Sequence, residues 1–310
     1  MIKVFDGHCD TISRCYRYGT SLRKNEGHMD LERMHRGNFA QFFATFASAK
    51  HVDKPIYQVF LGQLETFQRQ MAENADWVVH CRTAQQAEEA WKAGKTAAFL
   101  SVEGAELLDC DIEKLEDAYQ KGVRAVNLTW NHVNALSGTN VDQPEKGLTP
   151  QGKAFAARMQ ELGMLVDVSH LSDPGFWDVI ELAKKPIFAS HSNSRAICGH
   201  TRNLTDEMFT ALIKNGGVTG FNMGSDFVGE DPGIDTIIAH IEHWLSLGGE
   251  QNISLGGDWD GVGSMPKGIT GIQDLEKLAE RLLQMNYSEA LVEALFYRNL
   301  MRVVGEVCTA

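Results

Sequence analysis

The chain has 310 residues, of which 43% are hydrophobic, and a formal net charge of −12 at pH 7. A chain of this length and composition can bury a large core, and eight-stranded α/β barrels often reach this size as one domain. The excess of acidic residues argues against a nucleic-acid partner, because binding to phosphates depends on clustered Lys and Arg. We therefore expect one domain over residues 1–310 and no nucleic-acid partner.

The start of the chain and its apolar stretches bear on where the protein works. Met1 leads directly into the first predicted strand, without the basic region and apolar core of a signal peptide. No stretch approaches the roughly 20 apolar residues that are needed to cross a bilayer. The sequence therefore predicts a cytoplasmic protein with no membrane partner. Its six cysteines lack the spacing of a disulfide framework, so we expect free thiols.

Eight short apolar runs are predicted to be strands. They span residues 4–10, 39–46, 95–103, 123–130, 165–170, 186–191, 217–223 and 253–258. The runs are apolar almost throughout, which is typical of strands that are covered on both faces. The phenylalanines of residues 39–46 are expected in the core, because no Lys or Arg interleaves them as in a base-stacking surface.

Segments with apolar residues at helical spacing lie between these runs. They span residues 57–75, 83–94, 112–122, 150–163, 174–184, 205–215, 234–247, 273–285 and 288–304. Thr149 before Pro150 is typical of a helix start, and Gly122, Gly163 and Gly216 stand where helices end. The alternation of strand and helix predicts a parallel sheet, because parallel neighbours need a crossover between them.

Eight such units favour closure into a (β/α)8 TIM-type barrel, and an open doubly wound sheet is the alternative. Residues 131–147 follow the fourth predicted strand and show no clear periodicity. We therefore predict that they form a rim loop over the functional site.

Side chains that bind metals or move protons stand at the ends of five of the runs. These are His8 and Asp10, Glu103, His170, His191 and Asp258. In a barrel the ends of parallel strands share one rim, where barrel enzymes place their chemistry. His8 and Asp10 are two apart in a strand and therefore face the same side. Burial of Glu103 without a partner would cost several kcal/mol, and bound cations would remove that cost.

Taken one at a time, these residues have ordinary explanations. A His-x-Asp pair is more often a plain strand end, and a single histidine is more often a core or rim residue. Three histidines and two carboxylates at equivalent strand ends instead form the mixed nitrogen and oxygen ligand set that suits zinc. Five ligands exceed the needs of one tetrahedral zinc ion, so we infer two metals that share a carboxylate. Such a pair lowers the pKa of a bridging water toward neutrality.

Short motifs in a fixed order run along almost the whole chain. They are DGHCD at 6–10, SVEG at 101–104, GLT at 147–149, LGM at 162–164, DVSH at 167–170, SHS at 190–192, TRN at 201–203, GGDWDG at 256–261 and NLMRV at 299–303. In these motifs the chain resembles the membrane dipeptidase (renal dipeptidase) family of zinc peptidases, family M19, in its soluble bacterial form. The resemblance implies an amidohydrolase-like barrel of the metal-dependent hydrolase type.

The resemblance also implies a role for each ligand candidate. His8 and Asp10 would hold one zinc ion, and Glu103 would bridge this ion to a second one. His170 and His191 would complete the second site. Each subunit would then hold two Zn²⁺ ions, bridged by Glu103 and a hydroxide.

Further roles follow from the same resemblance. Asp258 would carry a proton from the attacking water to the leaving amine, and Asp260 ranks second because it lies farther past the strand end. Arg202 would bind the terminal carboxylate of the substrate through its planar guanidinium. The implied reaction is hydrolysis of dipeptides of the L,L type, with L,D dipeptides as further candidates. A homodimer is also implied, although no residue pattern supports it.

One position departs from the family pattern. Mammalian members carry a histidine after Leu-Thr at the end of the fourth strand, where it steadies the oxyanion, whereas this chain has Trp130. An indole donates one hydrogen bond and carries no charge. We expect Trp130 to contact the substrate. His132 either supplies an imidazole to catalysis or is an exposed loop residue, and both interpretations stay open.

Two other functions stay open. A different metal-dependent hydrolase on the same barrel, acting on a cyclic amide, a lactone or the amino group of a base, would keep Asp258 but would not need Arg202. A barrel that binds a peptide or a metal without turnover is the second alternative, which Trp130 keeps open.

Other histidines receive simpler interpretations. His240 and His243 are predicted to be surface residues of their helix, because no third ligand accompanies them. His28, His35 and His51 lie in loop-like segments, and one of them is a candidate for the wall of the substrate pocket.

Overall fold

Parallel strands form the centre of the computed structural model, which describes residues 2–34, 38–48, 50 and 52–309. They are β1 (Val4–Cys9), β2 (Phe39–Phe46), β3 (Val78–His80), β4 (Thr96–Glu103), β5 (Val123–Asn127), β6 (Leu165–Asp167), β7 (Phe188–Ala189), β8 (Val218–Phe221) and β9 (Ile253–Leu255). Neighbours follow the order β2-β1-β9-β8-β7-β6-β5-β4, and β2 also pairs with β4. In the described part of the chain, eight strands thus close into the predicted (β/α)8 barrel, and each of them lies within a predicted run.

One strand, β3, was not predicted. It pairs with Thr96, Ala97 and Ala98 at the start of β4, before Leu100, where β5 joins the same strand. The three residues of β3 are buried, exposed and half-buried in turn, so no apolar run marks this strand. β3 extends the wall of the barrel and takes no part in closing it.

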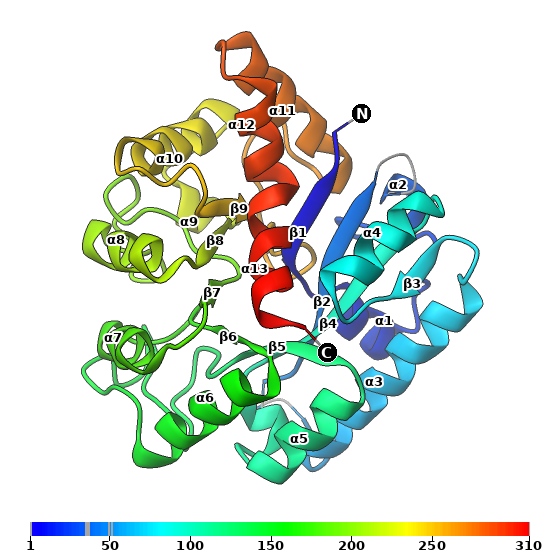
Figure 1. Ribbon diagram of the computed structural model, residues 1–310. Coiled ribbons are helices and arrows are strands. Elements are labelled where there is room, and N and C mark those ends of the chain that lie inside the picture. Colours follow the sequence, from blue (N-terminus) through cyan, green and yellow to red (C-terminus); the bar gives the residue numbers. More distant parts are fainter. Residues whose placement is uncertain (1, 35–37, 49, 51, 310) are drawn as a thin grey trace.

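Helices surround the barrel on its outer side (Figure 1). They are α1 (Thr11–Tyr18), α2 (Leu31–Met34), α3 (Ile56–Glu73), α4 (Ala84–Lys92), η2 (Ala105–Leu108), α5 (Ile112–Gln120), α6 (Pro150–Leu162), α7 (Asp173–Leu182), α8 (Asp206–Asn215), α9 (Ser225–Val228), α10 (Ile234–Ser246), η3 (Ile272–Asp274), α11 (Leu275–Gln284), α12 (Glu289–Glu293), η4 (Ala294–Arg298) and α13 (Asn299–Val307). Every predicted helical segment is confirmed. The helices that were not predicted, α1, α2, η2 and α9, are too short to show a periodic pattern.

Local signals set the ends of α6 as predicted. The hydroxyl of Thr149 accepts a hydrogen bond from the N–H of Gly152, and Pro150 occupies the first turn. Gly163 follows the helix with a φ of 79°, a left-handed conformation that a side chain would oppose.

Four phenylalanines fill the interior of the barrel below its polar rim. Phe5, Phe42, Phe99 and Phe188 come from different strands, and their contacting ring pairs have centroids 5.1–5.7 Å apart. Gly7 makes room for them, since a Cβ at this position would lie 2.7 Å from Cζ of Phe188. Helix α13 packs against the same cluster. These four rings fill the interior of the barrel with apolar atoms. The polar side chains gather instead near the carboxyl ends of the strands.

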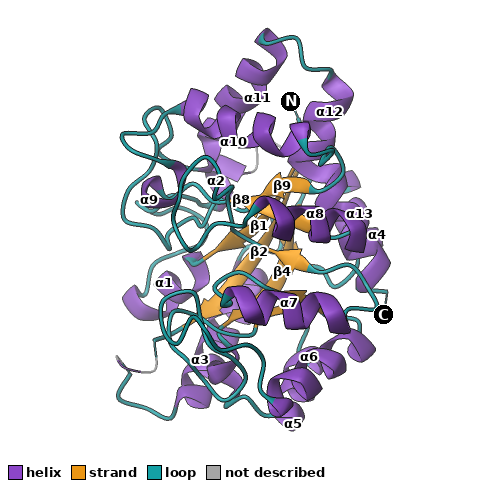
Figure 2. Cartoon of the chain, turned by 90° about the vertical axis from the view of Figure 1, so that its left-hand side faces the viewer, coloured by secondary structure: helices purple, strands orange, loops and turns teal. Residues whose placement is uncertain are grey.

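Loops gather beside that polar end of the barrel, as Figure 2 shows for the segments around α1 and α9. Residues 131–147 belong to this rim, and Asn131, Asn140 and Val141 line its cavity, so the predicted rim loop is confirmed. All six cysteines are free, as expected. Among the described helices, none combines the length and the apolar character needed to span a membrane.

The surface position predicted for His240 is wrong. His240 on α10 is fully buried, with Nδ1 accepting from the N–H of Ser194 and Nε2 donating to the carbonyl of Val228. Helix α10 packs beneath the loops that follow β7 and β8, which the spacing of one helix does not reveal. His243 is half-buried, with Nε2 lying 2.8 Å from Oδ1 of Asp206 on α8.

Candidate metal centre

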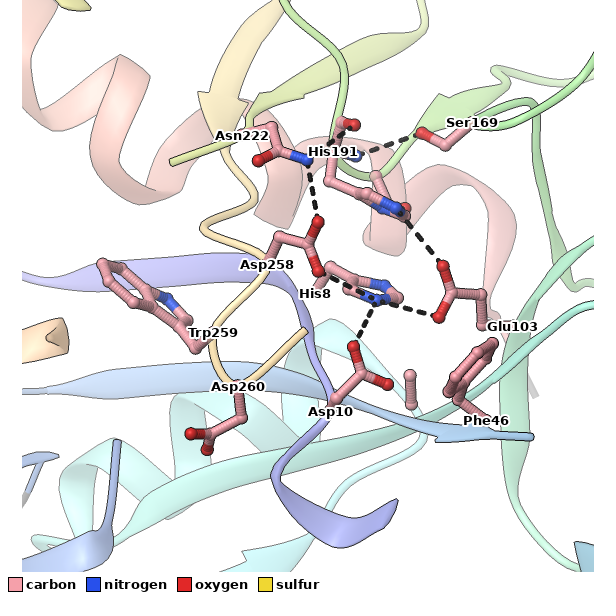
Figure 3. A network of polar contacts seen from close by, with 12 residues as sticks. His8, Asp10, Phe46, Glu103, Ser169, His191, Asn222, Asp258, Trp259 and Asp260 are labelled. Atoms are coloured by element: carbon pink, nitrogen blue, oxygen red, sulfur yellow. Dashed lines mark hydrogen bonds and ion pairs between the residues drawn. The ribbon is translucent and has the colours of Figure 1, made fainter. Parts of the chain in front are cut away.

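Ionisable side chains from five strand ends converge on one point of the rim (Figure 3). They are His8 from β1 with Asp10 just after it, Glu103 from β4, His170 after β6, His191 after β7 and Asp258 after β9. Each of these residues is less than a tenth exposed. The fold therefore brings together all of the residues that were predicted as metal ligands, together with the predicted proton carrier.

The first group of donor atoms surrounds Nε2 of His8. This nitrogen lies 3.7 Å from Oδ2 of Asp10, 3.5 Å from Oε2 of Glu103 and 3.9 Å from Oδ1 of Asp258. Within the described structure, neither this buried nitrogen nor Oδ1 of Asp10 has a hydrogen-bond partner. Ligands bound about 2.1 Å from one tetrahedral zinc ion are roughly 3.4 Å apart, so these separations suit atoms around a cation better than direct hydrogen bonds.

The second group contains Nε2 of His170, Nε2 of His191 and Oε1 of Glu103. The two nitrogens are 2.9 Å apart, and they lie 2.9 and 3.4 Å from the carboxylate oxygen. Nδ1 of His170 lies 2.8 Å from Oδ1 of Asn131, and Nδ1 of His191 lies 2.6 Å from Oγ of Ser190. A ring N–H donated to Asn131 leaves a lone pair on Nε2 of His170, which is the tautomer that binds a metal.

Burial and charge act against each other in the centre. Burial lowers the pKa of His170 and His191 well below the usual range and raises the pKa of Glu103 to about 7. Burial also lowers the pKa of His8, but the carboxylates of Glu103 and Asp10 outweigh it and leave that pKa well above the usual range. Neutral imidazoles keep a lone pair that can bind a metal, and crowded carboxylates are costly to bury without a cation. The residues therefore fit a pair of divalent metal ions.

Asp6 fastens the two strands that carry the first group. It lies two residues before His8, is fully buried and accepts four hydrogen bonds. Oδ1 accepts from the N–H of His8 (3.1 Å) and Nε2 of Gln41 (2.9 Å), and Oδ2 accepts from the N–H of Gly257 (2.8 Å) and Nε1 of Trp259 (3.0 Å). The residues on both sides of Asp258 are thereby tied to β1, which holds Asp258 at a positive φ of 55°.

Asp167 supports the second group in the same way, by accepting hydrogen bonds from the backbone. Its Oδ1 accepts from the N–H groups of Ser169 and Ser190, both at 3.0 Å. These serines immediately precede His170 and His191, so one buried carboxylate sets the backbone of both ligands. His170 itself has a φ of 72°, because the chain turns sharply after β6.

Asp258, and not Asp260, faces the cluster. Oδ2 of Asp258 accepts from Nδ2 of Asn222 at 2.9 Å. Asp260 points away from the ligands in Figure 3, and its carboxylate accepts from Oγ1 of Thr11 and from the N–H of His28. His28 therefore anchors Asp260 instead of lining the cavity.

A cavity of about 1030 Å³ opens above the centre. Its wall includes Asp10, Glu103, His170, Arg202 and Asp258. His200 also lines it, although it was not singled out from the sequence. The other two histidines proposed for the pocket wall, His35 and His51, lie outside the described residues.

Arg202 is a buried cation in the wall of this cavity. Nη1 donates to Oγ of Ser192 at 3.3 Å, and Nη2 donates to the carbonyl of His191 at 3.2 Å. Burial lowers the pKa of Arg202 to about 10, so the guanidinium keeps its charge at neutral pH. Among the described residues, buried Nε has no hydrogen-bond partner, which leaves a donor for a ligand.

Trp130 and His132 occupy different environments. Trp130 lines the cavity and packs on Phe46, with ring centroids 4.8 Å apart. The ring of His132 lies edge-on to the indole, with centroids 5.3 Å apart, and its Nδ1 is 3.4 Å from Nζ of Lys50. His132 is absent from the described wall of the cavity. A catalytic role for His132 would therefore need a rearrangement of this loop.

Several residues that support the site were not predicted. Asp6 and Asp167 carried a usable signal, because each is a charged residue within an apolar run, shortly before a ligand. Asn131, Ser190 and Asn222 carried none, since polar residues at strand ends and in loops are common. Only their contacts with the ligands reveal them.

The chain matches known proteins over its full length. The sequence model of the membrane dipeptidase family, peptidase family M19, matches residues 1–310. An uncharacterized protein from the pqqA 5′ region of Klebsiella pneumoniae is 32% identical over 257 residues, which cover 79% of this chain and 94% of that protein. An uncharacterized dipeptidase of Schizosaccharomyces pombe is 31% identical over 298 residues, covering 89% of this chain and 71% of that protein.

A similar solved structure is that of a metallo peptidase from Rhodobacter sphaeroides, liganded with a phosphinate mimic of the dipeptide L-Ala-D-Ala. It has a TM-score of 0.91 and 26% identity, and the match covers 99% of each chain. The barrel, the order of the motifs and the full-length match agree. The chain belongs to the membrane dipeptidase family of metallopeptidases, family M19.

Proposed function

We propose that the protein is a dipeptidase that uses two zinc ions. His8 with Asp10 would hold one ion, His170 with His191 the other, and Glu103 would contact both. The observation that carries this proposal is the pair of buried donor groups that share the two oxygens of Glu103. When bound, the ions would polarise the scissile carbonyl and lower the pKa of a water between them toward neutrality.

Asp258 is the proposed proton carrier. Its Oδ1 lies at the edge of the first group, 3.9 Å from Nε2 of His8, while Asn222 orients Oδ2. Burial raises the pKa of Asp258, which favours uptake of a proton during the reaction. Asp258 takes a proton from the attacking water as the C–O bond forms. It then gives this proton to the amine nitrogen as the C–N bond breaks.

Arg202 sets the length of the substrate in this proposal. Its guanidinium is bonded to His191 and Ser192, next to the second donor group. A carboxylate bound by Arg202 therefore belongs to the residue directly after the scissile bond. A tripeptide would place an uncharged peptide group next to the guanidinium of Arg202. The buried charge of Arg202 would then lack a negatively charged partner.

The family and the related structures support this proposal. The dipeptide mimic bound by the Rhodobacter sphaeroides protein contains a D-residue on the carboxyl side. L,D dipeptides are therefore proposed as substrates beside L,L dipeptides.

The first test is release of free amino acids from L,L and L,D dipeptides by protein stripped of metal and then restored with zinc. We expect hydrolysis only after zinc is restored, and little hydrolysis of tripeptides. Two bound zinc ions per chain, measured by atomic emission, are expected in the restored protein. Zinc binding without hydrolysis of any dipeptide would favour a binding role instead.

Arg202→Met separates a dipeptidase from another hydrolase on the same barrel. Loss of a charged hydrogen bond to the carboxylate should lower kcat/KM for dipeptides by about 10- to 100-fold. Dipeptide amides lack the carboxylate and serve as the matched substrate, for which the variant should behave like wild type. A hydrolase of cyclic amides or lactones would keep its full activity in this variant.

A further inference from the structure

Asn140 carries a buried amide that no protein group satisfies. The residue is 6% exposed and lines the cavity above the metal centre. Within the described structure, neither Oδ1 nor Nδ2 has a hydrogen-bond partner. Burial of an amide without a partner costs roughly 1–3 kcal/mol, so such a group in a native protein calls for a partner outside the chain, such as a ligand or an ordered water.

The backbone around Asn140 is firmly held beside a ligand. Its N–H donates to the carbonyl of His170 at 3.1 Å, and Thr139 next to it forms a bridge with Leu171. The hydroxyl of Thr139 accepts from the N–H of Asp142 at 2.8 Å, which closes a tight turn. A fixed backbone thus holds Asn140 in the wall of the cavity, with both amide atoms covered from solvent, and such preorganisation is what a catalytic donor needs.

Asn134, in the same loop, shows what a structural asparagine looks like. Its Nδ2 donates to the carbonyl of Leu128 and to Glu106, and its Oδ1 accepts from the N–H of Leu136. Asn134 therefore holds the loop together through its side chain. Asn140 holds the loop only through its backbone, which leaves its amide available for another partner.

Two other side chains of this rim, His132 and Trp130, are poorly placed to donate to a substrate oxygen. The imidazole of His132 lies by Lys50, outside the described cavity wall, and Trp130 packs its ring on Phe46. Acceptors, by contrast, are plentiful, because the carboxylates of Glu103 and Asp258 line the same cavity. Within the described loop of residues 131–147, the amide of Asn140 is the buried side-chain amide without a partner.

We infer that Asn140 is a catalytic residue whose Nδ2 donates a hydrogen bond to the oxygen of the scissile carbonyl. The bond strengthens as this oxygen gains negative charge in the transition state. The inference rests on the proposed dipeptidase function. Asn140 would then stabilise the oxyanion, which is the role that the sequence left open for His132. Trp130 would form an apolar wall for the substrate.

Two substitutions test whether Asn140 donates or accepts. Asn140→Ala removes the donor, and loss of one such donor should lower kcat by about 100-fold or more with little change in KM. Asn140→Asp keeps the shape but replaces the donor by a negative acceptor, so kcat should fall further than in the Ala variant. Exposed Glu145 lies in the same loop, and Glu145→Ala should keep wild-type kinetics.

Binding and stability complete the test. A phosphinate mimic of a dipeptide should bind both Asn140 variants at least 10-fold more weakly by calorimetry, because its oxygens imitate the charged transition state. The Tm of the metal-loaded Asn140→Ala variant should match or exceed that of wild type, whereas Asn134→Ala should lower it.

The outcomes separate the two proposals. If wild-type protein hydrolyses dipeptides but Asn140→Asp keeps or raises kcat, Asn140 accepts from the substrate or does not touch it, and this inference is overturned. Loss of kcat in His132→Ala alone would also overturn it. If wild-type protein with two zinc ions cleaves no dipeptide, the proposed function has failed, and the inference about Asn140 fails with it.

Discussion

The two sides of the candidate metal centre contain different kinds of side chain. The carboxylate side consists of His8, Asp10 and Asp258, whose charged groups stand 3.7 and 3.9 Å from the central nitrogen. The imidazole side consists of His170 and His191, whose Nε2 atoms are only 2.9 Å apart. The carboxylate side gathers negative charge that only a cation can balance. The imidazole side is neutral and depends on the orientation of its rings.

Two buried carboxylates that bind no substrate support these sides in different ways. Asp6 uses both of its oxygens and ties β1 to the residues around Asp258. Asp167 accepts both of its backbone N–H groups on Oδ1 alone. Asp167 also has a side-chain hydrogen bond with Ser190. From the backbone bonds we predict that a change of geometry harms the carboxylate side more than the imidazole side.

Glu103 joins the two sides, and its loss should have the largest effect. Glu103→Ala removes an oxygen from each donor group, so we expect fewer than two bound metal ions per chain. Metal ions contribute several kcal/mol to such hydrolyses, and kcat/KM should fall by about 1,000-fold or more. Metal content by atomic emission and dipeptide kinetics check this prediction.

The stability of metal-free protein is the control for Glu103→Ala. Burial raises the pKa of Glu103 to about 7, which means that its carboxylate is unfavourably buried without a cation. The metal-free Glu103→Ala variant should therefore have the same Tm as the metal-free wild-type protein, or a higher one. A lower Tm would indicate that Glu103 holds the fold together, and the loss of activity would then need another explanation.

Asp6→Asn and Asp167→Asn test the difference between the two supports. Each carboxylate oxygen of Asp6 accepts from two donors, and an asparagine would place an NH2 group in front of one such pair. The free energy of unfolding should therefore fall by roughly 2–4 kcal/mol. Metal affinity should fall by about 10- to 100-fold, as is usual when a group that orients ligands is lost. At position 167 the remaining oxygen still accepts both N–H groups, and we expect only a few-fold loss.

Urea unfolding and competition with a zinc chelator measure the two effects. Circular dichroism of each variant verifies that the barrel is intact. Equal losses in both variants would contradict the comparison, because the charge of the two carboxylates, and not their hydrogen-bond geometry, would then be what matters.

The last effect concerns acid, and it acts on the loop behind the imidazole side. Burial lowers the pKa of His240 to about 4, against about 6.5 in an unfolded chain. The unfolded state therefore binds more protons between these values, so stability is full above pH 6.5 and declines as the pH falls toward 4. This group should contribute a loss of roughly 3 kcal/mol over that window.

Unfolding of metal-free protein between pH 7 and pH 4.5 checks the contribution of His240. His240→Asn is less stable at neutral pH, but its stability should depend less steeply on pH than that of wild type. His243→Asn, on the same helix, should keep the steep dependence. Identical slopes in wild type and His240→Asn would show that the buried imidazole is not the source of the acid sensitivity.

Most of the barrel followed from local pattern. Apolar runs and helical spacing reflect burial within single elements, and eight strands and every predicted helix were found where expected. The strand β3 was not predicted, because only one of its three residues is buried. His240 was misplaced because the burial of a polar side chain depends on which distant loops cover it.

The sequence by itself determined which kinds of side chain stand at the strand ends, because residue type and strand position are local properties. Only the tertiary structure decided which of them meet. That Asp258 faces the donor groups depends on the hydrogen bond that Gly257 donates to Asp6 and on the one that Asn222 donates to Asp258. The position of Asn140 in the cavity wall depends on backbone pairing with the segment after β6. Such contacts join residues far apart in the chain, and no local periodicity encodes them.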